Sequence, residues 1–224
     1  MYKALEEALG YQYKNKELLQ QALSHSSYAN EVYKDSLGSY ERLEFLGDSI
    51  LGFVTAEYLW QTFPTKPEGE LTRIRAELVC EKNLAVVAKQ IRLGDYLLLG
   101  HGEAQGGGRN RSGILCDVME ALIAAAYLDS GFSQAKGIVH RLILPMLDRI
   151  SQSCDYKTEL QELIQRKKDQ HLCYEVLEET GPDHCKEFLV RVCLNGIEIG
   201  RGSGSSKKRA EQSSAQDALK TLRK

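Results

Sequence analysis

The chain has 224 residues, 42% of them hydrophobic and 27% charged, and carries a formal net charge of -2. This size allows one large core and a smaller second one, and the composition excludes a disordered or fibrous protein. No stretch reaches the roughly 18 apolar residues of a membrane helix, and residues 1–20 look like neither a secretory signal nor a transit peptide, so we expect a cytosolic protein with no membrane partner.

The cysteines agree with that expectation. The chain has 6 cysteines and none of them forms a C-x-x-C pair, which argues against a zinc ribbon and against a redox motif. We therefore expect free thiols at Cys80, Cys116, Cys154, Cys173, Cys185 and Cys193.

From residue 3 to about residue 150 the apolar residues recur at helical spacing, as they do in Leu43, Leu46, Ile50 and Phe53. This pattern predicts an all-α domain, a helical bundle, over residues 1–150. Glycine, proline and serine interrupt the pattern, so we expect breaks at Gly10, 36–39, 64–69, Gly94 and 101–113. The last of these breaks is glycine-rich but lacks the G-K-[ST] ending of a phosphate-binding loop, which predicts a flexible loop and no organic cofactor.

The stretch ERLEFLGDS, residues 41–49, places Glu41, Glu44 and Asp48 on one face of a predicted helix. A row of acids is usually a solvated surface. Here, however, Glu44 and Asp48 repel each other by roughly 0.2–0.5 kcal/mol, and Arg42 is the only basic residue of the stretch. Gly47 inside the helix costs about 1 kcal/mol relative to alanine, which indicates that another backbone or a ligand approaches closely there.

A second acidic pair, Asp117 and Glu120, shares one face of a predicted helix that is otherwise apolar and therefore buried. Hydrogen bonds or a salt bridge would satisfy such a pair, and for the pair alone this structural interpretation is favoured. If the helix packs against residues 41–49, however, four carboxylates converge, and unit charges about 4 Å apart repel by roughly 4 kcal/mol. Cations would then fill the gap.

Oxygen ligands alone select Mg²⁺, with Mn²⁺ as its substitute, over zinc. A di-iron site would need an E-x-x-H pair, and neither Glu44 nor Glu120 is followed by histidine at that spacing. Clustered divalent ions suit hydrolysis of a phosphodiester by water.

Residues 151–156 form a short linker, after which the pattern changes. We expect a helix over about 157–169, three strands, and a helix over about 206–222. Phe188, Val190, Val192 and Leu194 alternate with the residues between them, which is typical of a half-buried strand. Residues 157–224 therefore predict a small α+β domain of order α-β-β-β-α.

Positive charge gathers at the C-terminal end. Residues 1–154 carry 16 Lys and Arg against 19 Asp and Glu, whereas residues 201–224 carry 7 against 2. A basic helix alone is often only solvated. Here Lys207, Lys208 and Arg209 follow a Gly/Ser turn at a predicted helix N-terminus, where backbone N–H groups already favour phosphate.

These motifs together resemble the bacterial ribonuclease III family over essentially the whole chain. ERLEFLGDS matches its signature nonapeptide, and the match extends through LSHSSYANE (23–31), PEGELTRIRAELV (67–79) and the segment of Asp117 and Glu120. The resemblance implies an endoribonuclease that hydrolyses phosphodiester bonds in double-stranded RNA with metal-activated water. It also implies 5'-phosphate and 3'-hydroxyl ends with short 3' overhangs, and the processing of ribosomal, messenger and other structured RNA precursors.

The resemblance assigns roles to the acids. It implies that Asp48 and Glu120 are catalytic, that Glu44, Asp117 and Glu120 hold the metal, and that Glu41 and Glu68 line the cleavage site as further acids.

The resemblance also implies a homodimer in which Phe45 enters a pocket on the partner. Without the family, a position in the core is the commoner role of such a phenylalanine. Arg109 and Arg111 either contact RNA phosphates or are ordinary surface residues. His25 is expected to be a structural hydrogen-bonding residue rather than a base.

Residues 157–224 resemble a double-stranded-RNA-binding domain. A-form RNA hides its base edges in a narrow groove, so such a domain reads 2'-hydroxyls and phosphates over ~16 base pairs. The resemblance places phosphate contacts on Lys207, Lys208 and Arg209. It places minor-groove contacts on Thr158, Gln161, Glu162, Gln165 and, in the loop GPDH, His184.

Two other functions compete with this one. A catalytically silent double-stranded-RNA-binding regulator of the same fold would be expected to lack acids such as Asp48 or Glu120, and the acid set is complete. A helical metal or interaction protein unrelated to RNA leaves the C-terminal domain unexplained.

Overall fold

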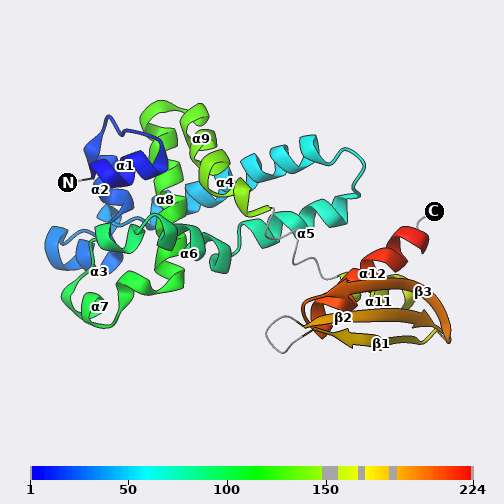
Figure 1. Ribbon diagram of the computed structural model, residues 1–224. Coiled ribbons are helices and arrows are strands. Elements are labelled where there is room, and N and C mark those ends of the chain that lie inside the picture. The colour runs from blue at the N-terminus through cyan, green and yellow to red at the C-terminus, as the bar shows by residue number, and fades with distance from the viewer. Residues whose placement is uncertain (1, 148–155, 166–169, 182–185, 223–224) are drawn as a thin grey trace. The chain divides into compact units, whose positions relative to one another are not determined.

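The computed structural model describes residues 2–147, 156–165, 170–181 and 186–222. The chain divides into two compact units, Met1–Ser151 and Gln152–Lys224, and each has its own hydrophobic core (Figure 1). The linker expected at 151–156 falls almost entirely outside the described residues. No helix in the described ranges is long and apolar enough to span a bilayer.

Unit 1 is built from helices, as predicted. Its α-helices are α1 (Lys3–Leu9), α2 (Lys16–Ala22), α3 (Ser26–Tyr28), α4 (Glu41–Thr62), α5 (Glu68–Leu78), α6 (Glu81–Gln90), α7 (His101–Gln105), α8 (Ser112–Ser130) and α9 (Phe132–Leu142). Short π-helical or 3₁₀ turns lie between them at η1 (Ala29–Tyr33), η2 (Ser36–Gly38), η3 (Leu93–Tyr96), η4 (Gly108–Asn110) and η5 (Leu144–Met146).

Helix α8 runs through the middle of unit 1 (Figure 1), and its residues from Val118 to Ala126 are all buried. The buried helix that its apolar run predicts is thus confirmed. Helix α4 crosses it at Gly47, where an added Cβ would lie 1.9 Å from the carbonyl oxygen of Glu120. Of the two alternatives expected at Gly47, another backbone or a ligand, the structure shows the backbone of α8.

Two expectations about unit 1 are wrong. Phe53 lies at core spacing but is 60% exposed, because the inner face of α4 continues through Val54 and Leu59. Its ring makes an edge-on contact with Phe132. The flexible loop expected at 101–113 instead contains α7, η4 and the start of α8.

Polar contacts explain why residues 101–113 are ordered. The Arg109 guanidinium donates to the carbonyls of Gly94 and Leu97, at 2.9 Å each, and Arg111 pairs with Glu103 at 2.8 Å. Both arginines therefore have structural contacts. His25 caps α3 by accepting a hydrogen bond from the backbone N–H of Ser27, so its predicted structural role is confirmed.

Unit 2 has the predicted order α-β-β-β-α, with α11 (Tyr156–Gln165), β1 (Leu172–Thr180), β2 (Glu187–Leu194), β3 (Ile197–Gly204) and α12 (Lys207–Leu222). The sheet is antiparallel in the order β1-β2-β3. Helix α12 packs on β2 and β3 and against α11, so both helices cover one face of the sheet (Figure 1). Residues 166–169, expected to extend the first helix, lie outside the described part.

The alternation predicted for β2 holds for Phe188, Val190 and Val192, which are buried beneath the helices. It fails near the strand end, where Leu194 is only half-buried and Cys193 is 3% exposed. A register shift between Val192 and Cys193 interrupts the pairing with β3 there. Cys80, Cys116, Cys173 and Cys193 are free thiols, as expected, whereas Cys154 and Cys185 are outside the described residues.

Candidate functional site

Four acids from two crossing helices gather in unit 1. Helix α4 contributes Glu44 and Asp48, and α8 contributes Asp117 and Glu120. Since Gly47 has no side chain, the α8 backbone passes directly against α4 between the two pairs. The packing on which the sequence prediction depended is therefore present, and we name these residues the four-acid cluster.

Burial and mutual repulsion govern the cluster. Glu120 is only 8% exposed, and burial, followed by the charges of Asp48 and Glu44, raises its pKa to about 8. Burial likewise raises the pKa of Glu44, with the Asp117 charge as the next cause. The pKa of Asp117 is raised by burial as well, although a hydrogen bond from Tyr40 opposes the shift. All three carboxyl groups are thus destabilised in their charged form.

Two neighbours that the sequence did not single out contact the cluster as donors. The Tyr40 hydroxyl donates to Oδ2 of Asp117 at 3.2 Å, and the Cys116 thiol points to Oε1 of Glu120 at 3.9 Å. Burial, reinforced by these carboxylates, raises the pKa of both the phenol and the thiol, so both keep their protons. Each lies directly beside a motif acid in the sequence, and that adjacency was the only available signal.

The cluster fits a hard divalent cation. Among the described residues, no lysine or arginine forms an ion pair with any of the four acids. No three of their carboxylate oxygens lie within 4.8 Å of one another, so these side chains would rotate inward to hold one ion together. The four carboxylates supply oxygen ligands, the set that Mg²⁺ and Mn²⁺ prefer.

The other predicted acids occupy different places. Glu41 begins α4 and acts on Glu44 through its charge. Glu68 begins α5, accepts a hydrogen bond from Thr72, and lines a cavity of about 460 Å³ with Phe53 and Trp60.

Phe45 projects from α4 beside Glu44 and is 79% exposed. The interpretation as a core aromatic is therefore wrong, since the described part of unit 1 leaves most of the ring uncovered.

Unit 2 presents the predicted polar residues at its surface. Thr158, Gln161, Glu162 and Gln165 are exposed along α11, and Lys207, Lys208 and Arg209 are exposed in the first turn of α12. The Ser206 hydroxyl accepts from the backbone N–H of Arg209, and the Ser205 hydroxyl accepts from its guanidinium. His184 and its loop lie outside the described residues.

Comparison with known proteins agrees with this division. Residues 15–147 match the family model described as ribonuclease-III-like, and residues 156–222 match the double-stranded RNA binding motif. The chain is 44% identical to ribonuclease 3 of Listeria monocytogenes, over 99% of this chain and 97% of that protein. It is 45% identical to ribonuclease 3 of Bacillus cytotoxicus, over 99% and 91% of the two chains.

Solved structures agree as well. The nuclease domain of ribonuclease III from Campylobacter jejuni aligns with a TM-score of 0.58 and 42% identity, covering 63% of this chain and 92% of that one. A second structure of that domain, described as flexible in a region involved in dimer formation, aligns with a TM-score of 0.59 and 42% identity, covering 64% and 96%. The chain thus belongs to the ribonuclease III family and is an endoribonuclease with a C-terminal double-stranded RNA binding motif.

Proposed function

We propose that the protein hydrolyses both strands of duplex RNA in a metal-dependent reaction, with the four-acid cluster as its active site. The observation that carries the proposal is Glu120, which is buried among three other carboxylates without a cationic partner among the described residues. Such an arrangement destabilises the fold unless a cation occupies it, and active sites are where such costs are retained.

The residues in and around the four-acid cluster have different proposed roles. Glu44, Asp117 and Glu120 would hold Mg²⁺, or Mn²⁺ as its substitute, and Asp48 completes the acidic surface facing the scissile phosphate. When bound, the ion would supply an activated water and stabilise the leaving oxygen. The Tyr40 hydroxyl keeps Asp117 turned toward the cluster, and Cys116 does the same for Glu120. Glu41 and Glu68 would add negative charge along the path of the RNA.

Unit 2 would supply duplex recognition. The exposed polar row on α11 suits 2'-hydroxyls in a minor groove, and the cations at the start of α12 suit phosphates, because the helix N-terminus adds its own N–H donors. His184 is proposed as a further minor-groove contact. Since shape and phosphates are read, affinity should fall as salt rises, with weak sequence preference.

We further propose a homodimer in which Phe45 enters a pocket of the partner and the two active sites cut opposite strands. Support comes from the 79% exposure of Phe45, together with the exposed Phe53 and Trp60 on the same helix. Two cuts on opposite strands leave short 3' overhangs with 5'-phosphates and 3'-hydroxyls. Structured precursors of ribosomal and messenger RNA in the cytoplasm are the proposed substrates.

The test is cleavage of a long perfect duplex RNA in Mg²⁺ by the wild type, by Glu120→Gln, and by Glu7→Gln, an exposed acid of α1, as control. We expect cleavage by the wild type and the control. Glu120→Gln should bind the duplex and leave it intact. A wild-type protein that binds duplex RNA but never cuts it would support the catalytically silent regulator instead, and full activity of Glu120→Gln would remove the cluster from catalysis.

A further inference from the structure

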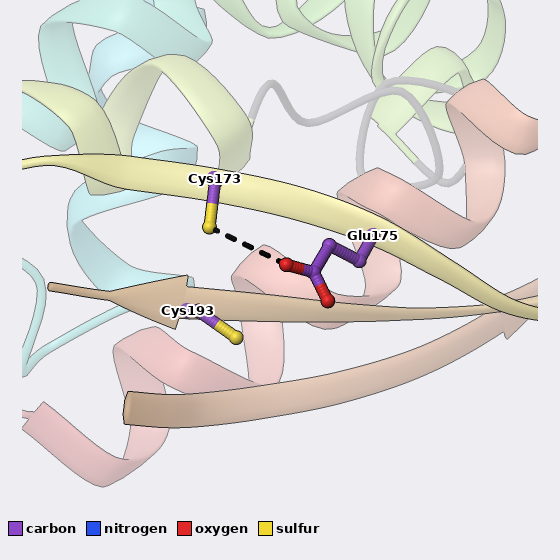
Figure 2. Close-up of side chains that lie close together, drawn as sticks. All are labelled: Cys173, Glu175 and Cys193. Carbon is purple, nitrogen blue, oxygen red and sulfur yellow. Dashed lines mark hydrogen bonds between the residues drawn. The ribbon is translucent and has the colours of Figure 1, made fainter. Parts of the chain in front are cut away.

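A second group of metal-binding side chains lies in unit 2, on the face of the sheet that the helices leave uncovered. Cys173 and Glu175 of β1 point to the same side, and Cys173 is directly opposite Cys193 of β2 (Figure 2). The two sulfurs and one oxygen of Glu175 all lie within 4.8 Å of one another. No other such group is present in the described part of the chain.

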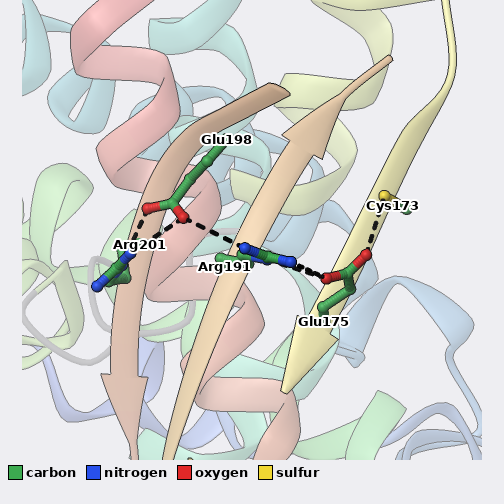
Figure 3. Close-up of polar contacts among 5 residues, drawn as sticks. All are labelled: Cys173, Glu175, Arg191, Glu198 and Arg201. Atoms are coloured by element: carbon green, nitrogen blue, oxygen red, sulfur yellow. Dashed lines mark hydrogen bonds and ion pairs between the residues drawn. The ribbon is translucent and has the colours of Figure 1, made fainter. Parts of the chain in front are cut away.

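Arg191 fixes the direction of the Glu175 carboxylate. Its Nε and Nη2 both donate to Oε2 of Glu175, at 2.9 and 2.6 Å, which leaves Oε1 directed at the Cys173 sulfur 4.0 Å away (Figure 3). In protein metal sites, a carboxylate that binds the ion commonly accepts hydrogen bonds from a neighbouring side chain, which orients it. Glu198 of β3 is engaged by Arg201 at 2.9 and 3.0 Å, and its Oε2 also lies 3.9 Å from Nη1 of Arg191.

We propose that Cys173, Glu175 and Cys193 form a site for a thiophilic divalent cation, best matched by Zn²⁺. Two sulfurs select zinc over magnesium. Zn²⁺ lies about 2.3 Å from sulfur and about 2.0–2.2 Å from oxygen, so small side-chain rotations bring the three atoms to bonding distance. Water takes the fourth position, on the open side where Glu175 is exposed.

Charge and protons balance at this site. Each thiol releases its proton to solvent as its sulfur bonds the ion, so binding liberates two protons. Two thiolates, one carboxylate, one guanidinium and a divalent cation are together neutral, which makes Arg191 part of the site rather than a competitor for Glu175. The ion would link β1 to β2 near Cys193, where the pairing of β2 with β3 is irregular.

The experiment uses the full chain with the other four cysteines changed to serine, reduced and in excess Mg²⁺, which occupies oxygen-only sites. Titration with Co²⁺ should give thiolate-to-cobalt absorption that saturates at one ion per chain and disappears when Zn²⁺ is added. Cys193→Ser should abolish the signal. Arg191→Lys, which keeps the charge but loses the paired donation, should weaken binding about tenfold.

The melting temperature is a second readout, which distinguishes loss of metal binding from failure to fold. Zn²⁺ should raise the melting temperature of unit 2 in the background variant, because only the folded state has the site, and should leave the melting temperature of Glu175→Gln almost unchanged. Absence of thiolate absorption in the folded background variant would overturn the proposal. So would absorption that survives loss of both Cys173 and Cys193, or formation of a disulfide between them with no metal uptake by the reduced protein.

Discussion

Replacing Gly47 with alanine should separate the two helices that carry the four-acid cluster. The added Cβ would lie 1.9 Å from the carbonyl oxygen of Glu120, and that oxygen belongs to helix backbone that cannot rotate away. Real contacts of this type stay beyond about 3 Å, so α4 and α8 must move apart locally by roughly 1 Å or more. A shift of this size in a catalytic group costs about 100-fold in rate.

The same helix provides a matched control. Gly52 also lies within α4, but nothing lies within 4 Å of a Cβ added there. Gly52→Ala should therefore stabilise unit 1 by up to about 1 kcal/mol through helix propensity alone. Gly47→Ala gains the same propensity but loses roughly 1–3 kcal/mol to overpacking, so the two variants should differ by that overpacking cost.

Urea unfolding followed by far-ultraviolet circular dichroism measures this difference, because unit 1 is built from helices such as α4 and α8. Both variants are compared at one protein concentration, since any association shifts apparent stability. Cleavage of duplex RNA is measured under conditions where both proteins are folded. If Gly47→Ala matches Gly52→Ala in both stability and rate, the helix contact does not set the position of the acids.

Three further predictions concern single groups. Burial raises the pKa of Glu120 to about 8 from 4.5, so between these pH values the folded state holds a proton that the unfolded chain releases. In the absence of metal, the free energy of unfolding should therefore fall by roughly 2–3 kcal/mol as the pH rises through this range, after a discount for solvent screening. Urea unfolding measures this fall, and Glu120→Gln should remove most of it. Phe45→Ala should convert a dimer to monomers in sedimentation without lowering monomer stability, and an unchanged sedimentation profile would exclude Phe45 as an anchor. Changing Lys207 and Lys208 to alanine should weaken binding to all duplexes alike and reduce the slope of log affinity against log salt by about one per lysine, whereas a sequence-dependent loss would contradict phosphate contacts.

Local patterns could predict the helices of unit 1, the element order of unit 2 and the close approach at Gly47. Hydrophobic periodicity and the unfavourable helix propensity of glycine both depend on residues that are neighbours in the chain. What could not be predicted were contacts fixed by tertiary packing. Phe53 has core spacing yet is exposed. Residues 101–113 are ordered because Arg109 donates to the carbonyls of Gly94 and Leu97 and Arg111 pairs with Glu103, and the glycine-rich composition reveals neither contact. The hydrogen bond from Tyr40 to Asp117 joins residues 77 apart in sequence, so no spacing rule reveals it.

The two candidate metal sites differ in their ligand atoms, and these atoms would decide which ion each site binds. The four-acid cluster offers four carboxylates and one thiol, that of Cys116, which points to Oε1 of Glu120. In unit 2 two sulfurs and one carboxylate oxygen lie within 4.8 Å of one another. Because paired sulfur ligands select zinc over magnesium, zinc added at low concentration should occupy unit 2 before it disturbs cleavage in Mg²⁺.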